Sequence, residues 1–270
     1  MKYITLINII VRGIFVAATF IVIKQPSDYV IVPLLWSIGY VLGGAFSIWV
    51  TFFKHKLSFQ IPSRKILKNH LREGSIIFAS DALLTIKDKF NYNLLGAIVG
   101  ISDIVIYDIG SKISNILQKP VTIMSTALFP QMAQNPDVSR AKKAMLAIVL
   151  FSVVTVTLVN LFMPWIVRFF IHEIVDLSAI RLYSIAPIIV GLSSFIAVNV
   201  FFAFGKDKLV LKSSYVTTFG YIILLAVMYF GGLLTTVTSF VYLTIVSYSI
   251  EAIYRYILAN RIFKEQNIIE

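Results

Sequence analysis

Cationic side chains interrupt the long apolar stretches of this 270-residue sequence at five positions, and charges in such surroundings need a chemical explanation. They are Arg12, Lys87, Lys89, Lys112 and Lys119. A Lys or Arg at the centre of a membrane helix costs about 2.5–3.5 kcal/mol, so five lipid-facing cations would cost roughly 12–17 kcal/mol. Lys119 can extend to the interface, but Arg12, Lys87 and Lys112 cannot. We therefore expect a wet or ion-paired interior around them.

A polar stripe runs along residues 103–128. Its members follow spacings of four, three, four, three and four, which place them on one face of a helix: Asp108, Lys112, Asn115, Lys119, Thr122 and Thr126. Two shorter stripes have the same helical spacing, one with Asp81, Thr85, Asp88 and Tyr92 and one with Thr5, Asn8, Arg12 and Thr19. We interpret these faces as the lining of a cavity.

The chemistry of such a cavity follows from its side chains. Cations in excess over carboxylates favour a phosphate or diphosphate, and amides and hydroxyls suit a sugar. We expect substrate binding by the five cations and an amide, namely Arg12, Lys87, Lys89, Lys112, Asn115 and Lys119. The carboxylates Asp81, Asp88 and Asp108 are candidates for coupling to a cation or for holding the lysines.

Simpler explanations of the same residues stay open. Asp108 and Lys112 are four apart and could neutralise each other on one helix. Residues 87–89 could form a structural ion-pair cluster, and Arg12 could cap carbonyls of a neighbouring helix. We interpret Glu251 and Arg255, also four apart, as a structural pair.

Composition excludes several classes of function. The chain has no Cys and only three His, so thiolate, iron–sulfur and multi-histidine metal sites are not expected. No phosphate-binding loop and no Ser, His and acid arrangement suggests catalysis, so we expect neither an enzyme nor a cofactor. A net charge of +11 would indicate nucleic acid in a soluble protein. In a chain that is 58% hydrophobic it indicates basic loops instead, and we expect no nucleic-acid partner.

The elements that must position these residues are membrane helices, each about 20 residues long. Long runs without period-two alternation favour helices over a barrel. The predicted fold is an all-α polytopic membrane protein with eight transmembrane helices, at residues 3–23, 29–53, 75–100, 103–128, 143–171, 179–204, 209–230 and 233–259.

The charges of the connections predict the topology. Every second connection between the predicted helices lies on the same side of the membrane. The connections on one side, together with Lys2 and the C-terminal end, hold 16 of the 24 Lys and Arg residues, and those on the other side hold about three. The positive-inside rule then places both termini in the cytoplasm, as an even number of spans also requires. The long basic connection at 54–73 predicts a boundary between a region at 1–60 with two helices and a region at 61–270 with six.

Three groups of motifs resemble polysaccharide flippases of the Wzx type. LREGSIIF at 71–78 and NLLG at 93–96 look like the seventh helix of that family. IYDIGSKI at 106–113, Lys119-Pro120 and LFPQ at 128–131 are similar to the eighth helix and the turn after it. KYITLIN at 2–8 and KQPSDY at 24–29 look like the fifth helix and its exit.

The resemblance implies membership of the multidrug/oligosaccharidyl-lipid/polysaccharide (MOP) exporter superfamily, whose members have two six-helix lobes around a central cavity. We therefore expect a MATE-like bundle that lacks counterparts of the first four of twelve helices. The implied function is translocation of an undecaprenyl diphosphate-linked oligosaccharide across the bacterial inner membrane by alternating access, for O-antigen, capsule or exopolysaccharide synthesis. The implied partners are the lipid-linked oligosaccharide and membrane lipids, with a glycan polymerase and a chain-length regulator as further candidates.

Three alternatives remain. A drug or cation antiporter of the same superfamily would have a carboxylate-rich, aromatic cavity. A membrane glycosyltransferase or glycan polymerase would need a sizeable outer loop, whereas the longest outer connection expected here is 172–177. A transport-incompetent, truncated fragment is the third alternative, because helices of the family are missing.

Overall fold

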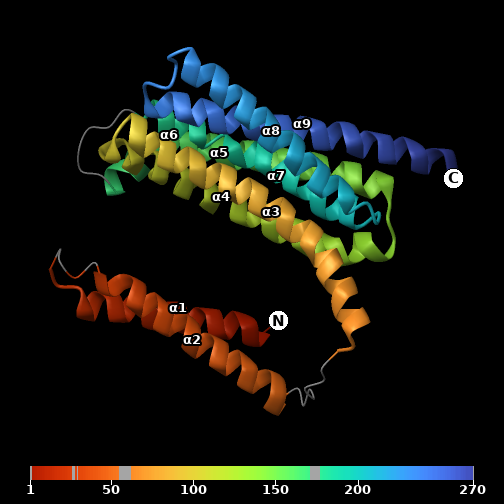
Figure 1. Cartoon of the computed structure of the whole chain (residues 1–270), viewed down its shortest axis with the longest axis horizontal. Helices are drawn as coiled ribbons and strands as arrows, with labels where there is room; N and C mark the ends of the chain where they lie inside the picture. Colours follow the sequence, from red (N-terminus) through yellow and green to blue (C-terminus); the bar gives the residue numbers. More distant parts are fainter. Residues whose placement is uncertain (1, 26–27, 29, 55–61, 171–176, 270) are drawn as a thin grey trace. The chain divides into compact units, whose positions relative to one another are not determined.

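The computed structural model describes residues 2–25, 28, 30–54, 62–170 and 177–269, and over these ranges it is helical without a strand. Figure 1 shows the chain, which divides into two compact units, Met1–Leu67 and Lys68–Glu270. The division falls in the first turn of helix α3 (Arg64–Ile98). The boundary predicted after residue 60 and most of the predicted outer connection at 172–177 lie outside the described residues.

The N-terminal unit is a helical hairpin. It consists of α1 (Lys2–Val22) and α2 (Ile31–Trp49), which continues as the π-helical turn η2 (Val50–Lys54). A Cβ on Gly39 of α2 would lie only 3.3 Å from Cγ1 of Val11 of α1, so this glycine permits the close approach of the two helices. Phe15 packs edge-on against Trp36, with ring centroids 5.1 Å apart.

The C-terminal unit is a bundle that continues from α3 through α4 (Ile101–Gln134), α5 (Val138–Phe170), α6 (Ser178–Tyr183), α7 (Ala186–Ile196), the π-helical η3 (Ala197–Phe202), α8 (Lys208–Phe230) and α9 (Val237–Ile269). Helix α4 is central, since it packs against α5, α6, α7, η3 and α9. Small residues make this contact possible. A Cβ on Gly191 would lie 3.0 Å from Cγ1 of Val121, and one on Gly110 would lie 3.1 Å from Cβ of Tyr183.

Each of the eight predicted apolar segments coincides with one or more of these helices. Five of the described segments are both long and apolar enough to cross a membrane, namely Ile31–Lys54, Val138–Phe169, Ser178–Phe202, Lys208–Phe230 and Val237–Gln266. Helices α3 and α4 are long but carry the charges singled out above, which lower their hydropathy. The all-helical, multi-pass architecture is therefore confirmed, while the count of eight spans stays a prediction.

A polar layer separates two apolar clusters inside the C-terminal unit. Along α9, Leu243 belongs to one cluster and Leu258 to the other. Between them lie three buried polar side chains, Ser247, Glu251 and Arg255. Because buried polar groups need partners, this layer must be satisfied by neighbouring helices.

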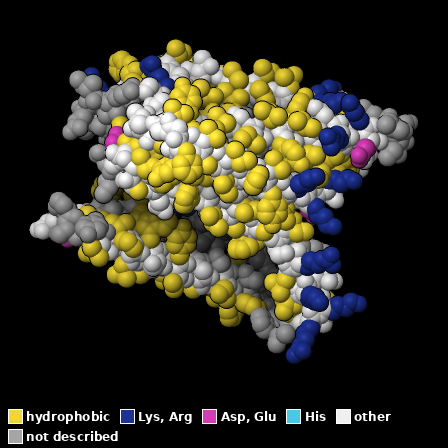
Figure 2. Space-filling model, turned by 45° about the horizontal axis from the view of Figure 1, so that its top comes forward, with side chains coloured by type: hydrophobic (Ala, Val, Ile, Leu, Met, Phe, Trp, Pro, Cys, Tyr) yellow, Lys and Arg dark blue, Asp and Glu magenta, His cyan; other side chains and the backbone are white. Residues whose placement is uncertain are grey.

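The turns at one end of this unit are rich in Lys and Arg. Figure 1 places the α4–α5 turn, the η3–α8 turn and the end of α9 at the same end of the bundle, and Figure 2 shows most Lys and Arg side chains gathered there. In the α4–α5 turn, Asp137 Oδ1 accepts a hydrogen bond from the backbone N–H of Arg140 at 3.1 Å. This hydrogen bond holds the pKa of Asp137 below its usual value.

Candidate functional site

The C-terminal unit contains a cavity of about 480 Å³, which we name the polar cavity. Helices α3, α4, α6, α7, α8 and α9 and the η3 turn all contribute to it. Its polar lining comes mainly from carboxylates, amides and hydroxyls, with one guanidinium: Ser80, Asp81, Asp88, Ser114, Asn115, Gln118, Tyr183, Ser193, Ser194, Tyr248, Glu251 and Arg255. Three of the nine predicted site residues are in this set, namely Asp81, Asp88 and Asn115.

A buried ion pair forms one wall of the polar cavity. Nη1 of Arg255 lies 2.6 Å from Oε1 of Glu251, one helical turn away. Arg255 also donates from Nε to Ser213 Oγ at 2.9 Å and from Nη1 to the Ser193 carbonyl at 3.2 Å. The Ser193 hydroxyl donates to Glu251 Oε1 at 3.2 Å. The pair thus joins α7, α8 and α9, and it also faces the cavity, which the sequence did not indicate.

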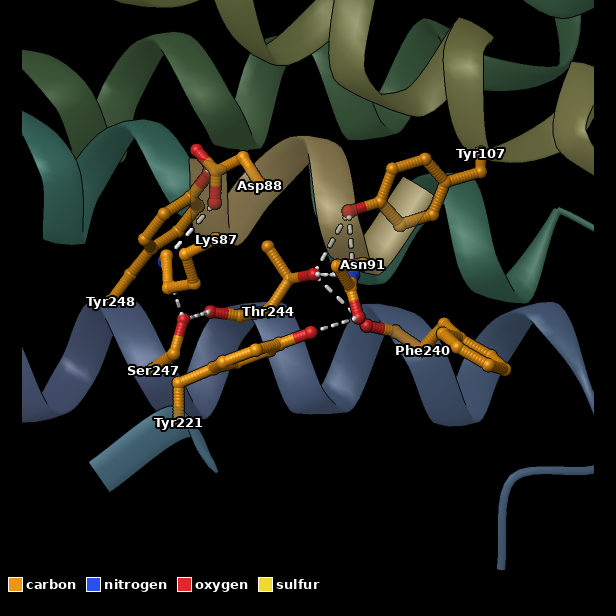
Figure 3. A network of polar contacts seen from close by, with 9 residues as sticks. All are labelled: Lys87, Asp88, Asn91, Tyr107, Tyr221, Phe240, Thr244, Ser247 and Tyr248. Atoms are coloured by element: carbon orange, nitrogen blue, oxygen red, sulfur yellow. Dashed lines mark hydrogen bonds and ion pairs between the residues drawn. The ribbon is translucent and has the colours of Figure 1, made fainter. Parts of the chain in front are cut away.

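Lys87 is buried beside the polar cavity rather than open to it. Only 3% of the residue is exposed. Its Nζ lies 3.1 Å from Asp88 Oδ1, donates to Ser247 Oγ at 2.9 Å and lies 4.5 Å from the ring centroid of Tyr248 (Figure 3). The Tyr248 hydroxyl donates to Asp88 Oδ2 at 3.2 Å. Asp88 keeps 45% of its side chain exposed, so the carboxylate rather than the ammonium meets the cavity.

The network extends deeper into the bundle through residues that the sequence analysis missed. Asn91 Nδ2 donates to Tyr107 OH at 3.1 Å and to Thr244 Oγ1 at 2.9 Å (Figure 3). The Tyr221 hydroxyl donates to Asn91 Oδ1 at 3.3 Å. Asn91 therefore connects α3 to α4, α8 and α9. The sequence feature that could have indicated Asn91 is its position four residues after Lys87, which places both residues on the same face of the helix.

The polar stripe of α4 points out of the unit. Lys112, Asn115 and Lys119 are exposed, and so are Thr122 and Thr126. Lys112 Nζ lies 2.6 Å from Asp108 Oδ2, which is the i,i+4 ion pair expected from the sequence. The Lys112 side chain is 70% exposed and that of Asp108 is 36% exposed. The hydroxyls of Thr122 and Thr126 donate to carbonyls of their own helix. Asn115 lies at the edge of the stripe and also reaches the polar cavity.

The remaining predicted cations also lie outside the polar cavity. Lys89 of α3 is exposed, and in the described part of the chain neither Lys89 nor Lys119 forms an ion pair. Arg12 belongs to the N-terminal unit, where it is exposed and lines a hollow of about 290 Å³ with Trp36, Tyr40 and other residues of the hairpin.

The sign of the charge in the polar cavity differs from the expectation. Asp81, Asp88 and Glu251 line it against a single cation, Arg255, so the cavity of this unit is acidic. The expected excess of lysines is present, but on the outward faces of α3 and α4. Helical spacing correctly grouped the stripe on one face, but it could not tell which way that face points. Among the described side chains, no group of three or more His, Asp or Glu could hold a metal ion.

Solved structures with a similar fold are transporters. A multidrug resistance MATE family transporter of the MOP superfamily, in an outward-facing conformation, matches with a TM-score of 0.74 and 16% identity over 98% of this chain and 63% of its own. MATE in complex with MaL6 matches with a TM-score of 0.74 and 15% identity over 96% of this chain and 62% of its own. A MOP superfamily transporter from Pyrococcus furiosus matches with a TM-score of 0.71 and 15% identity, over 96% and 62% of the two chains.

At these identities the likeness establishes the fold, which is MATE-like, and this chain spans about 63% of the length of the first of these structures. No curated protein matches the sequence. Residues 1–136, about half of the chain, match the family described as polysaccharide biosynthesis protein. The chain therefore belongs to the polysaccharide biosynthesis protein family, on the fold of the MATE transporters of the MOP superfamily.

Proposed function

We propose that the chain serves to move a lipid-diphosphate-linked oligosaccharide from the inner to the outer leaflet of a bacterial inner membrane. The family supports a role in polysaccharide assembly, and the fold supports a transporter. In this proposal the sugars and the diphosphate occupy a wet interior, and the lipid tail stays in the bilayer. Alternating access then comes from two discrete arrangements of the bundle.

One observation carries the proposal, namely the outward position of the lysines on α3 and α4. Lys112 and Lys119 lie near the middle of α4, and Lys89 lies in the second half of α3. A lipid-facing lysine at this depth would cost about 2.5–3.5 kcal/mol. An aqueous passage removes that cost and lets the ammonium groups bind phosphate oxygens, which accept charge-assisted hydrogen bonds.

The residues then take separate roles. Lys89, Lys112 and Lys119 bind the diphosphate, and Asn115 binds sugar hydroxyls at the rim of the polar cavity. Arg12, in the N-terminal unit, is a further proposed substrate-binding cation. Lys87 acts through Asp88, whose carboxylate it holds at the cavity surface by their ion pair. Asp81 and Asp88 couple transport to a cation, whereas Asp108 positions Lys112.

The test is export of lipid-linked glycan by the intact transporter. Replacing both Lys112 and Lys119 with Gln removes two phosphate contacts, each worth about 1.5–3 kcal/mol as a hydrogen bond to a charged group, so we expect export to fall at least about 100-fold. Glycan reaching the outer leaflet is measured in cells that depend on this transporter. Lys142 and Lys143, replaced by Gln at the end of the bundle, are the charge-matched control. Wild-type export by the Lys112 and Lys119 variant would contradict the proposal.

A drug or cation antiporter is the second candidate, because the polar cavity is acidic and contains Tyr183 and Tyr248. In that case replacing Asp81 and Asp88 with Asn would abolish cation-driven dye efflux from vesicles, whereas the two α4 lysines would be dispensable for efflux. Dye efflux that persists in the Lys112 and Lys119 variant but is lost in the Asp81 and Asp88 variant would favour this candidate over the flippase.

A further inference from the structure

A second cavity of the C-terminal unit is separate from the polar cavity and lies at the basic end of the bundle. It has a volume of about 880 Å³ and is lined by the first part of α3, the η3–α8 turn, the first turns of α8 and the last turns of α9. We name it the basic groove. Five cations contribute to its lining, namely Arg72, Lys206, Lys208, Lys212 and Arg261.

The charge of the basic groove is largely uncompensated. Two carboxylates, Asp207 and Glu265, face the five cations. Within the described ranges, none of the five forms a salt bridge with either carboxylate or with any other residue. All five side chains are exposed. Like charges gathered around one cavity repel one another, so an anion in the groove would relieve that repulsion.

The groove also has an apolar floor. Ile76, Leu209, Leu258 and Ile262 contribute to the lining below the charged rim. Figure 2 shows Lys and Arg side chains at this end of the bundle next to hydrophobic side chains. A soluble anion would gain nothing from such a floor, whereas a lipid places its phosphates at the rim and its glycerol and upper chains against apolar surface. Basic pockets between membrane helices bind lipid head groups in this way.

From these observations we infer that the basic groove binds the phosphate headgroup of an anionic phospholipid of the inner leaflet. A lipid with two phosphates, such as cardiolipin, fits best, because the cations come from three separate walls and can serve both groups. The site is independent of the transported substrate, so this inference stands or falls separately from the proposed function. Among the described residues, side-chain hydrogen bonds join α3 to α8 at Ser80 and Ser214 and α3 to α9 at Lys87 and Ser247, outside the groove. A bound lipid would join the same helices at the basic end.

The test measures lipid bound to the purified full chain by native mass spectrometry, with cardiolipin, phosphatidylglycerol or phosphatidylcholine titrated in detergent. We expect cardiolipin to bind more tightly than phosphatidylglycerol, and phosphatidylcholine to bind least. The variant with Lys212→Gln and Arg261→Gln should bind cardiolipin about 30-fold more weakly, since each cation near a lipid surface contributes about fivefold. A second variant, Arg72→Gln with Lys206→Gln, alters the other walls and should show a similar loss.

The matched control is Arg140→Gln with Lys143→Gln, which removes two exposed cations from the same end of the bundle but outside the groove. It should change cardiolipin binding less than about threefold. Equal losses in the control and in both groove variants would overturn the inference in favour of general surface charge. Displacement of cardiolipin by an equal concentration of soluble pyrophosphate would also overturn it, because the ligand would then be a free phosphate. Unfolding curves confirm that each variant is folded.

Discussion

At the scale of single residues, Arg255 and Glu251 form a buried ion pair in the C-terminal unit. The Ser193 hydroxyl bonds to both charged groups, whereas the Ser213 hydroxyl accepts a hydrogen bond from Arg255 alone. Burying two charges removes them from water, so the pair is tolerated only because each partner satisfies the other. The contribution of the pair to the free energy of unfolding should therefore depend on both residues being present.

Replacing Arg255 with Met should destabilise the protein by about 3–5 kcal/mol, because Glu251 is then left as a buried carboxylate with one serine donor. Replacing both residues, Arg255 with Met and Glu251 with Gln, should recover most of that loss, since no unpaired charge remains. Unfolding in mixed micelles with increasing denaturing detergent measures the two changes. A single variant that loses less than about 1 kcal/mol would show that the pair is not structural.

At the scale of elements, α4 carries two different outward surfaces. Asn115 and Thr122 lie on the polar stripe, whereas Ile116 and Ile123 lie one position further along and are 67% and 66% exposed. A helix with one polar and one apolar outward face can contact water on the first and hydrocarbon on the second. The stripe could be predicted from residue spacing. Its direction could not, because spacing within one helix contains no information about the neighbouring helices.

Single cysteines test this division of α4, and the chain offers a clean background because it contains no Cys. Asn115→Cys and Thr122→Cys should react with a water-soluble maleimide at least about tenfold faster than Ile116→Cys and Ile123→Cys, since the reactive thiolate does not form in hydrocarbon. Labelling is followed by the mass of the intact chain. Equal, slow labelling at all four positions would mean that the stripe contacts acyl chains, and the proposed passage would be wrong.

At the scale of the whole molecule, composition and hydropathy were sufficient to predict an all-helical membrane protein, and the motifs at 2–8, 24–29 and 71–131 together were sufficient to identify its family. The network around Asn91 could not be predicted in the same way. Its members come from four helices, α3, α4, α8 and α9, and most of them are more than 100 residues from Asn91 in the sequence. The acidic cavity was missed for a related reason, because Glu251 joins Asp81 and Asp88 only after α9 packs beside α3.

The orientation of the chain is a property of the whole molecule and can be measured with two further single cysteines. Lys143→Cys lies near the start of α5 at the basic end, and Leu233→Cys lies in the exposed α8–α9 turn at the other end. The positive-inside rule predicts that an impermeant maleimide labels residue 233 in intact cells and residue 143 only after permeabilisation. The reverse pattern would place the basic end of the bundle, with the C-terminal end of α9, outside the cytoplasm.

The four-residue spacing of Glu251 and Arg255 has a consequence for how α9 enters the membrane. This helix is the least apolar of the five long candidates, with a mean hydropathy of 1.3 against 2.5 for the segment of α5. A segment leaves the insertion machinery before its final neighbours are in place, so its charges must be masked locally during that interval. Two opposite charges one turn apart can meet as soon as the helix forms. The last helix can then partition into lipid while its two charges neutralise each other. When the bundle assembles, the pair gains its hydrogen bonds to the serines of α7 and α8.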